Sequence, residues 1–154
     1  MRAWAASKDT DKNIHVLRDQ LEKVNKEVKM FREVVKILLM HSLPYKIDEL
    51  ATQVDQVTSL VDRMMLVRLL EFSKEVTELF DKFDLSSVYR ATQNFIVRDV
   101  TEFYLEFSRY RRRRIMHKAG DSPVQVRDNS TLTAMYHCLQ TIILTAAPIL
   151  PFTA

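Results

Sequence analysis

The fold is decided by the segment T-L-T-A-M-Y-H-C-L-Q-T-I-I-L-T-A-A, residues 131–147, and by the P-I-L-P-F-T-A of residues 148–154 that follows it. Apolar residues recur in the segment at steps of three and four, which places them on one face of an α-helix. Pro148 has no backbone N–H and restricts Ala147, so the helix has to end there. We therefore predict a helix from about Ser130 to Ala147, whose inward residues are Leu132, Met135, Leu139, Ile142, Ile143 and Ala146.

Glycine is nearly absent from the chain, because Gly120 is the one glycine among 154 residues. Phosphate-binding loops and dinucleotide-binding turns both need several glycines around a phosphate, and hairpin-rich β proteins also favour glycine in their turns. The chain is 47% hydrophobic and 28% charged, as is usual for a soluble domain, and it is long enough for one domain with its own core. The composition therefore predicts an all-α domain without a nucleotide-binding loop.

A long first helix is predicted from about Val16 to Met40, because its apolar residues alternate in steps of four and three. A stripe this regular also occurs in coiled coils, but we favour packing inside a bundle, since later segments supply matching apolar faces. Residues 41–56 are then a linker, in which Pro44 breaks the helix. The predicted stripe consists of Leu17, Leu21, Val24, Val28, Phe31, Val35 and Leu38.

A second helix is predicted from about Thr58 to Lys82. Its first half is apolar on nearly every side, so we expect more than one neighbouring helix to bury that half. Its inward stripe is Val61, Met65, Leu69, Phe72, Val76, Leu79 and Phe80, and the additional apolar residues of the first half are Leu60, Met64, Leu66, Val67 and Leu70.

A third helix is predicted from about Ser87 to Met116, after the turn Asp84-Leu85-Ser86-Ser87. A Ser or Asp side chain in that turn can accept hydrogen bonds from the free N–H groups of the helix start. We expect the aromatic residues of its stripe to be core, with Tyr110 as an exception that could stack on a base beside positive charge. The stripe is Tyr89, Thr92, Ile96, Val100, Phe103, Phe107 and Tyr110.

Four helices joined by loops, the last loop at about residues 118–129, form an antiparallel bundle of about four long helices. We assign residues 15–154 to this bundle. Residues 1–14 are assigned to a segment that leads into it.

Several kinds of chemistry are excluded. The four histidines, His15, His41, His117 and His137, show no spacing that brings three or four metal ligands together. Cys138 lies in an apolar segment, where a thiol is inert packing, and a single cysteine cannot form an internal disulfide. No apolar run approaches the ~20 residues that a membrane span needs. We expect no catalytic site, no metal and no cofactor in this chain.

The one chemical signal is positive charge at residues 108–118, where five arginines and one lysine occur without an acid. The whole chain carries +3, so the remaining residues carry −3 once these six are set aside. Basic residues also favour helix C-termini, where free carbonyl groups make a negative pole, but two of them would satisfy that role. The excess favours contact with a nucleic-acid backbone.

Successive helical residues lie ~100° apart, so the arginine run encircles the helix axis and two or three of its members can touch one partner. Arginine suits phosphate because its planar fork donates two parallel hydrogen bonds. The candidates are Arg109, Arg112 and Arg113, which share one side, together with Lys118, and then Arg111 and Arg114.

Motifs over nearly the whole chain resemble one family, the anticodon-binding helical domain of class Ia aminoacyl-tRNA synthetases, and most closely that of bacterial-type or mitochondrial isoleucyl enzymes. The motifs are Arg2 to Asp9 (R-A-W-A-A-S-K-D), Leu60 to Arg63 (L-V-D-R), Phe83 to Tyr89 (F-D-L-S-S-V-Y), Gln93 to Phe95 (Q-N-F), Asp99, Phe103 to Glu106 (F-Y-L-E) and Asn129 to Phe152. The chain departs from the pattern at Met64, where the family usually has Trp, and at Ser108 to Arg112. Because valyl enzymes share a stretch similar to Tyr104-Leu105-Glu106-Phe107, isoleucine and valine specificity stay open.

The resemblance implies a domain that docks on the anticodon stem and loop of a tRNA, with isoleucine tRNA as the expected partner. The nucleotide-binding motifs of such enzymes are absent here, so ATP and Mg²⁺ would belong to the catalytic domain of a longer parent protein. It implies residues 1–14 as the end of the segment joining that domain to the bundle. A monomer is expected, without membrane contact, in a bacterial cytoplasm or a mitochondrial matrix.

Two alternatives remain. The chain could be a protein-interaction module whose first-helix stripe pairs with another chain, which predicts a dimer without RNA affinity. It could also retain a synthetase fold after losing RNA binding.

Overall fold

The structure, a computed structural model, describes residues 2–8, 17–42, 54, 57–110 and 129–151. Within these ranges the chain forms helices joined by turns and no strand, which confirms the predicted all-α class. Residues 106–110 continue the third long helix beyond its named elements. The elements are α1 (Arg2–Ala6), α2 (Arg18–Ser42), α4 (Leu60–Asp81), α5 (Leu85–Asn94), the π-helix η2 (Phe95–Leu105) and α7 (Asn129–Ala146).

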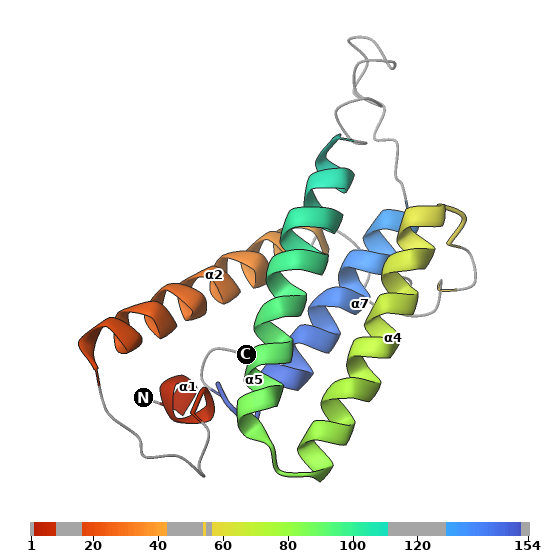
Figure 1. The fold of residues 1–154 in the computed structure, drawn as a ribbon. Helices are drawn as coiled ribbons and strands as arrows, with labels where there is room; N and C mark the ends of the chain where they lie inside the picture. The colour runs from red at the N-terminus through yellow and green to blue at the C-terminus, as the bar shows by residue number, and fades with distance from the viewer. Residues whose placement is uncertain (1, 9–16, 43–53, 55–56, 111–128, 152–154) are drawn as a thin grey trace.

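Helix α7 is the centre of the bundle, because both α2 and α4 pack along it. In Figure 1, α4 descends, α5 and η2 rise, and α7 descends again, so consecutive helices run in opposite directions as predicted. Helices α4 and α7 consequently lie side by side in the same direction. We call the end of the bundle at the start of α4 and α7 the upper end, and the end at the α4–α5 turn the lower end.

The core collects side chains from all four long helices. The rings of Phe72 and Phe95 stack with their centroids 4.1 Å apart and join α4 to η2. Fully burying one such side chain contributes about 1.5–3 kcal/mol, so these residues dominate the stability of the bundle. The largest buried side chains are Tyr104, Phe31, Phe72, Phe95, Leu38, Met65, Ile96, Met135 and Ile142.

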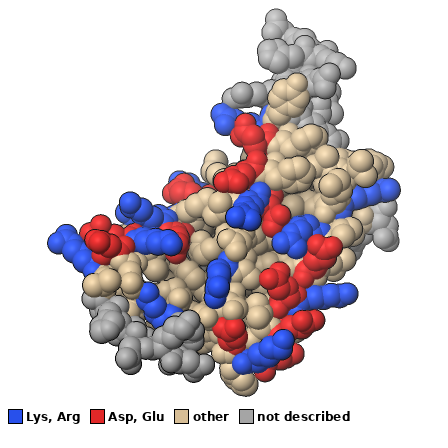
Figure 2. Space-filling model, viewed as in Figure 1, with Lys and Arg blue, Asp and Glu red and all other residues tan. Residues whose placement is uncertain are grey.

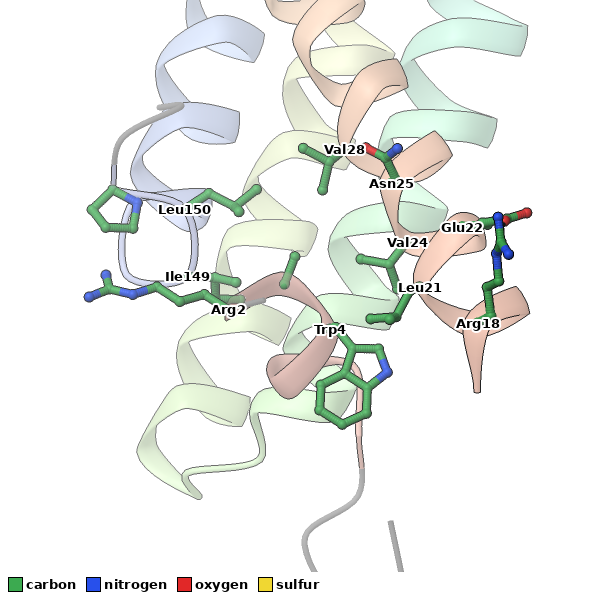
Figure 3. A pocket seen from close by; sticks show the side chains of 12 residues that line it. Arg2, Trp4, Arg18, Leu21, Glu22, Val24, Asn25, Val28, Ile149 and Leu150 are labelled. Carbon is green, nitrogen blue, oxygen red and sulfur yellow. The ribbon is translucent and has the colours of Figure 1, made fainter. Parts of the chain in front are cut away.

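Helix α2 begins and ends within two residues of the prediction, but only the second half of its stripe is core. Phe31 and Leu38 are buried, whereas Leu17 is 55% exposed. The first half of α2 leans away from the bundle and reaches past α1 (Figure 1). Its apolar side chains line a hollow of about 580 Å³ there. In Figure 3, Leu21, Val24 and Val28 of α2 face Trp4, Ile149 and Leu150 across this hollow.

One prediction about α4 is wrong. Its first half is not covered on every side, since Leu60, Met64, Val67 and Leu70 are 72%, 53%, 56% and 66% exposed. Helices α5, η2 and α7 all pack on the opposite face of α4, which carries the buried stripe. Helix α7 lies instead between α2 and α4, which both pack along it.

The third helix also differs from its prediction beyond Val100. Residues 95–105 form a π-helix with i→i+5 hydrogen bonds, so each turn holds more residues than in an α-helix. The buried positions after Val100 are therefore Tyr104 and Ser108, each four residues on. Phe103 and Phe107, predicted to be core, are 46% and 39% exposed.

The predicted helix ends at the lower end are confirmed. The carboxylate of Asp84 accepts a hydrogen bond from the Ser87 N–H at 3.0 Å and caps α5. Helix α7 ends at Ala146, two residues before Pro148, and the Ala146 carbonyl accepts from the N–H groups of Ile149 and Leu150. Helix α1 packs against α2 and α5, while the domain boundary at residue 14 stays a prediction.

Candidate nucleic-acid interface

Residues 108–118, which we call the basic segment, begin at the upper end of the bundle, on the last described turn after η2. Of the six candidate cations the structure describes Arg109, and the other five lie outside the described residues: Arg111, Arg112, Arg113, Arg114 and Lys118. The Arg109 guanidinium lies 3.9 Å from the Glu106 carboxylate, and both side chains are largely exposed, at 59% and 71%. Such a surface pair contributes about 0–1 kcal/mol, so Arg109 can exchange Glu106 for a phosphate at little cost.

Tyr110 lies next to Arg109 and is 62% exposed. The sequence singled it out as the aromatic residue of the third helix that could stack outside the core. Its exposure beside an exposed cation agrees with that exception, because base-stacking platforms combine an accessible ring with positive charge. Phe107 is 39% exposed one turn earlier and extends the accessible aromatic surface.

The upper end is fastened by a buried polar cluster that the sequence analysis missed. Asp62 of α4 is 1% exposed. The Tyr104 hydroxyl donates to its Oδ1 at 2.8 Å, and the Thr131 hydroxyl donates to its Oδ2 at 3.2 Å. The carboxylate thus joins α4 to the residues on both sides of the basic segment. We call Asp62, Tyr104 and Thr131 the clasp.

A second set of hydrogen bonds supports the clasp from the start of α4. The Thr58 N–H donates to the Ser130 hydroxyl at 3.2 Å, and Arg63 Nε donates to the Val57 carbonyl at 2.6 Å. Ser108, 2% exposed, donates its hydroxyl to the Leu105 carbonyl. Ser108 and Ser130 are buried, and buried polar groups are costly unless paired, so their pairing helps to fix where the chain leaves η2 and enters α7.

Arg68 ties α4 to η2 below the clasp. Its guanidinium lies 3.3 Å from the Asp99 carboxylate and 3.3 Å from that of Glu71. Partial burial works to lower the pKa of Arg68, but the two carboxylates outweigh it and the pKa is raised. Arg68 is therefore engaged within the bundle, unlike Arg109, and is a poorer candidate for a phosphate.

Charge over the face of the molecule that Figure 2 shows is mixed. Figure 2 shows Lys and Arg interspersed with Asp and Glu across the visible face, without a broad field of one sign. A nucleic acid would then be attracted by local groups of cations rather than by the bundle as a whole.

Nucleophilic and metal chemistry find no support in the described part of the chain. Cys138 is fully buried in the core as predicted, and burial, and next the negative charge of Asp62, raise the pKa of its thiol. Burial lowers the pKa of His137. Among the described residues no three His, Cys, Asp or Glu side chains gather to hold a metal ion. No described helix combines the length and apolar character that crossing a bilayer requires.

A signal for the clasp exists in the sequence in hindsight. Asp62 stands three residues before Met65, in the register of the buried stripe of α4, where an acid has to find partners. Which hydroxyls would serve could not be read from the chain, because Tyr104 and Thr131 are 42 and 69 residues away.

Comparison with known proteins gives a family match and several relatives. Residues 62–154 match the family described as the anticodon-binding domain of tRNA ligase. The chain is similar to isoleucine–tRNA ligases, with 30% identity over 154 residues for that of Lactococcus lactis subsp. lactis (strain IL1403) and 32% over 155 residues for that of Levilactobacillus brevis (strain ATCC 367). The ligase of Bacillus cereus (strain B4264) is 30% identical over 154 residues. Each alignment covers 100% of this chain and 16% of the relative, so the chain spans about one sixth of the length of these proteins.

Proposed function

Because the chain belongs to the family of anticodon-binding domains of tRNA ligases, we propose that it binds the anticodon stem and loop of a tRNA in an isoleucyl-tRNA synthetase-like protein. The observation that carries the proposal is the similarity to isoleucine–tRNA ligases along the whole chain. The exposed Arg109 and Tyr110 at the upper end support it, since they begin the most basic stretch of the sequence. The longer protein would attach isoleucine to its tRNA, using ATP and Mg²⁺ bound in its own catalytic domain.

The proposed contact is mainly electrostatic. Arginine side chains of the basic segment would neutralise phosphates of the anticodon stem, and Tyr110 would stack on a base. Phosphate contacts position an RNA but carry little sequence information. The choice of isoleucine tRNA over valine tRNA would therefore depend on parts of the longer protein as well. We also propose that the chain is a monomer, and the bacterial origin of the relatives favours work in the cytoplasm.

A salt series tests this contact. We expect the 154-residue chain to bind an isoleucine tRNA transcript with an affinity that falls steeply as salt rises. The double variant Arg112→Ala/Arg113→Ala should weaken binding and reduce the slope of log affinity against log salt by about 2. A matched control is Lys26→Ala/Lys29→Ala, which removes the same charge from the exposed face of α2. Affinity that ignores salt, or equal losses in both double variants, would contradict the proposal.

The exposed apolar row of α4 favours a second candidate, a protein-interaction role. The row consists of Leu60, Met64, Val67 and Leu70. The sequence predicts the apolar stripe of α2 as the protein-binding surface of this candidate, but the exposed row of α4 is the better surface for it. It predicts self-association that Leu70→Lys abolishes. Sedimentation velocity with and without tRNA separates the two candidates, because the RNA-binding role predicts a monomer that shifts only when tRNA is added.

A further inference from the structure

A second cationic surface lies at the lower end, opposite to the basic segment. The α4–α5 turn, the start of α5 and α1 surround a hollow of about 910 Å³. Four cations line it against one carboxylate, Asp84, which already caps α5. The cations are Arg2, Lys8, Lys82 and Arg90.

A neighbouring hollow of about 440 Å³ shares Lys8 and Arg90 with the first and adds Lys23 and Glu27. The Tyr89 hydroxyl donates a hydrogen bond to the Glu27 carboxylate at 2.7 Å, so this carboxylate already has a partner within the bundle. The joined surface then holds five cations and two carboxylates, each carboxylate hydrogen-bonded within the bundle. The net charge of this surface is therefore +3. The described ranges contain fifteen Lys and Arg against thirteen Asp and Glu, a net charge of +2, so the surface is more positive than all described residues together.

Phe83 lines the same hollow and is 89% exposed, the most exposed of the large apolar residues described. It is also the described non-glycine residue with positive φ, at 54°. The Phe83 N–H donates to the Phe80 carbonyl and the Asp84 N–H to the Leu79 carbonyl. This is the hydrogen-bond pattern of a Schellman cap, in which the left-handed position is usually glycine.

The fold therefore holds an aromatic ring where glycine would suit the backbone better. A side chain in the left-handed region costs free energy that glycine avoids, and the exposed ring recovers little of it by packing. Residues kept in such conformations gather at functional sites. Here the ring stands beside cations, which is how base-stacking platforms are built.

We call the 910 Å³ hollow that Phe83 lines the lower hollow. We propose that it holds the sugar-phosphate backbone of the RNA that the upper end binds, with one unpaired base stacked on Phe83. The inference rests on the proposed function. The cations select phosphate, and the exposed ring favours a nucleic acid over an acidic protein segment, which offers no unpaired base.

The two surfaces are separated by the length of α4, whose 22 residues span about 33 Å. Even at about 3.4 Å per base pair, the rise of a DNA duplex and an upper bound for A-form RNA, five base pairs span only about half of that distance. A hairpin with a five-base-pair stem can reach one surface but not both, whereas a whole tRNA can reach both. Simultaneous contact raises affinity without any new group on the protein.

The test compares variants of the 154-residue chain for binding to a whole tRNA transcript and to a hairpin with a five-base-pair stem. We expect Lys82→Ala/Arg90→Ala to weaken whole-tRNA binding about tenfold and to reduce the salt slope by about 2, with no effect on the hairpin. The control Lys26→Ala/Lys29→Ala removes equal charge outside both hollows and should change whole-tRNA binding less.

Phe83→Gly gives the sharper result, because stability and binding should move in opposite directions. Relief of the left-handed strain should raise Tm by about 2–4 °C, while loss of the stacked base should weaken whole-tRNA binding about tenfold with an unchanged salt slope. Phe83→Trp should retain the affinity. A merely structural Phe83 predicts no binding loss in the stabilised variant.

Three outcomes would contradict the further inference, the proposed function or the choice of RNA as the ligand, and they can be told apart. If hollow variants bind whole tRNA like the wild type while Arg112→Ala/Arg113→Ala does not, the inference fails and the proposed function stands. If the wild type binds no tRNA, both fail. If Phe83→Gly weakens binding of poly-glutamate as much as that of tRNA, the occupant is an acidic protein segment and the RNA assignment is wrong.

Discussion

The two ends of this bundle each hold an aspartate by hydrogen bonds, but the partners differ. Each end turns the chain between long helices, and each carries one aspartate that accepts two hydrogen bonds. At the upper end Asp62 is buried, with partners on two other helices. At the lower end Asp84 bonds Ser86 and Ser87, its neighbours in sequence. The difference teaches that a polar group's effect on stability depends on whether water can replace its partners.

The largest expected effect of this contrast is that of Asp62→Ala. The change removes the charged acceptor that the buried hydroxyls of Tyr104 and Thr131 share, and a hydrogen bond to a charged group contributes about 1.5–3 kcal/mol. We expect a loss of roughly 3 kcal/mol in the free energy of unfolding, measured by urea titration. Asp84→Ala is the matched change at the lower end and should cost clearly less, since water replaces its bonds. Equal losses would remove the contrast.

The next effect is that of the tyrosine hydroxyls. Tyr104→Phe removes the buried donor to Asp62 and should cost about 1–2 kcal/mol. Tyr89→Phe removes the donor to Glu27, a carboxylate that water can still reach, and should cost about 0.5–1 kcal/mol. Urea midpoints of both variants and of the wild type check the order. A costlier Tyr89→Phe would mean that burial does not rank these bonds.

The sequence predicts the lower end better than the upper end, for a physical reason. The Asp84 cap and the exit at Pro148 are local, because each depends on residues within a few positions. Apolar periodicity likewise placed α2, α4 and α7 within two residues of their ends. Local hydrogen bonding and side-chain periodicity are properties that a single stretch of chain carries by itself.

The clasp and the π-helix could not be predicted in that way. The clasp pairs residues that are 42 and 69 positions apart, so it depends on how the helices pack. The π-helix changes the number of residues per turn, which a 3.6-residue pattern cannot anticipate. The Thr101 hydroxyl donates to the Ile96 carbonyl at 2.7 Å, a five-residue step that matches this winding. The shift exposes Phe103 and buries Tyr104, and so it delivers the hydroxyl to Asp62.

The candidate site was predicted in part for the same reason. Charge density singled out the basic segment, and Arg109 is exposed as expected. The lower hollow stayed hidden, because its cations come from α1, the α4–α5 turn and α5, far apart in sequence. Phe83 begins one of the motifs that carry the family resemblance, but its left-handed conformation is visible only in the backbone.

The smallest expected effect is the pH dependence of the Asp84 cap. Hydrogen bonds from Ser87, and next from Ser86, lower the pKa of this carboxyl below its ordinary value of 3.8. A lowered pKa in the folded state means that the charged carboxyl stabilises the fold fully above pH 3.8, and that this contribution is lost as pH falls through the folded-state pKa. Asp84→Asn retains a capping side chain without the charge. The gap between the urea midpoints of the two proteins should therefore be small and constant near neutral pH, and should close below about pH 3.8. Because Asp84 is only half-buried and water reaches its carboxylate, 1 M salt should also shrink the gap at neutral pH. A gap that ignores both acid and salt would show that the cap acts through shape alone.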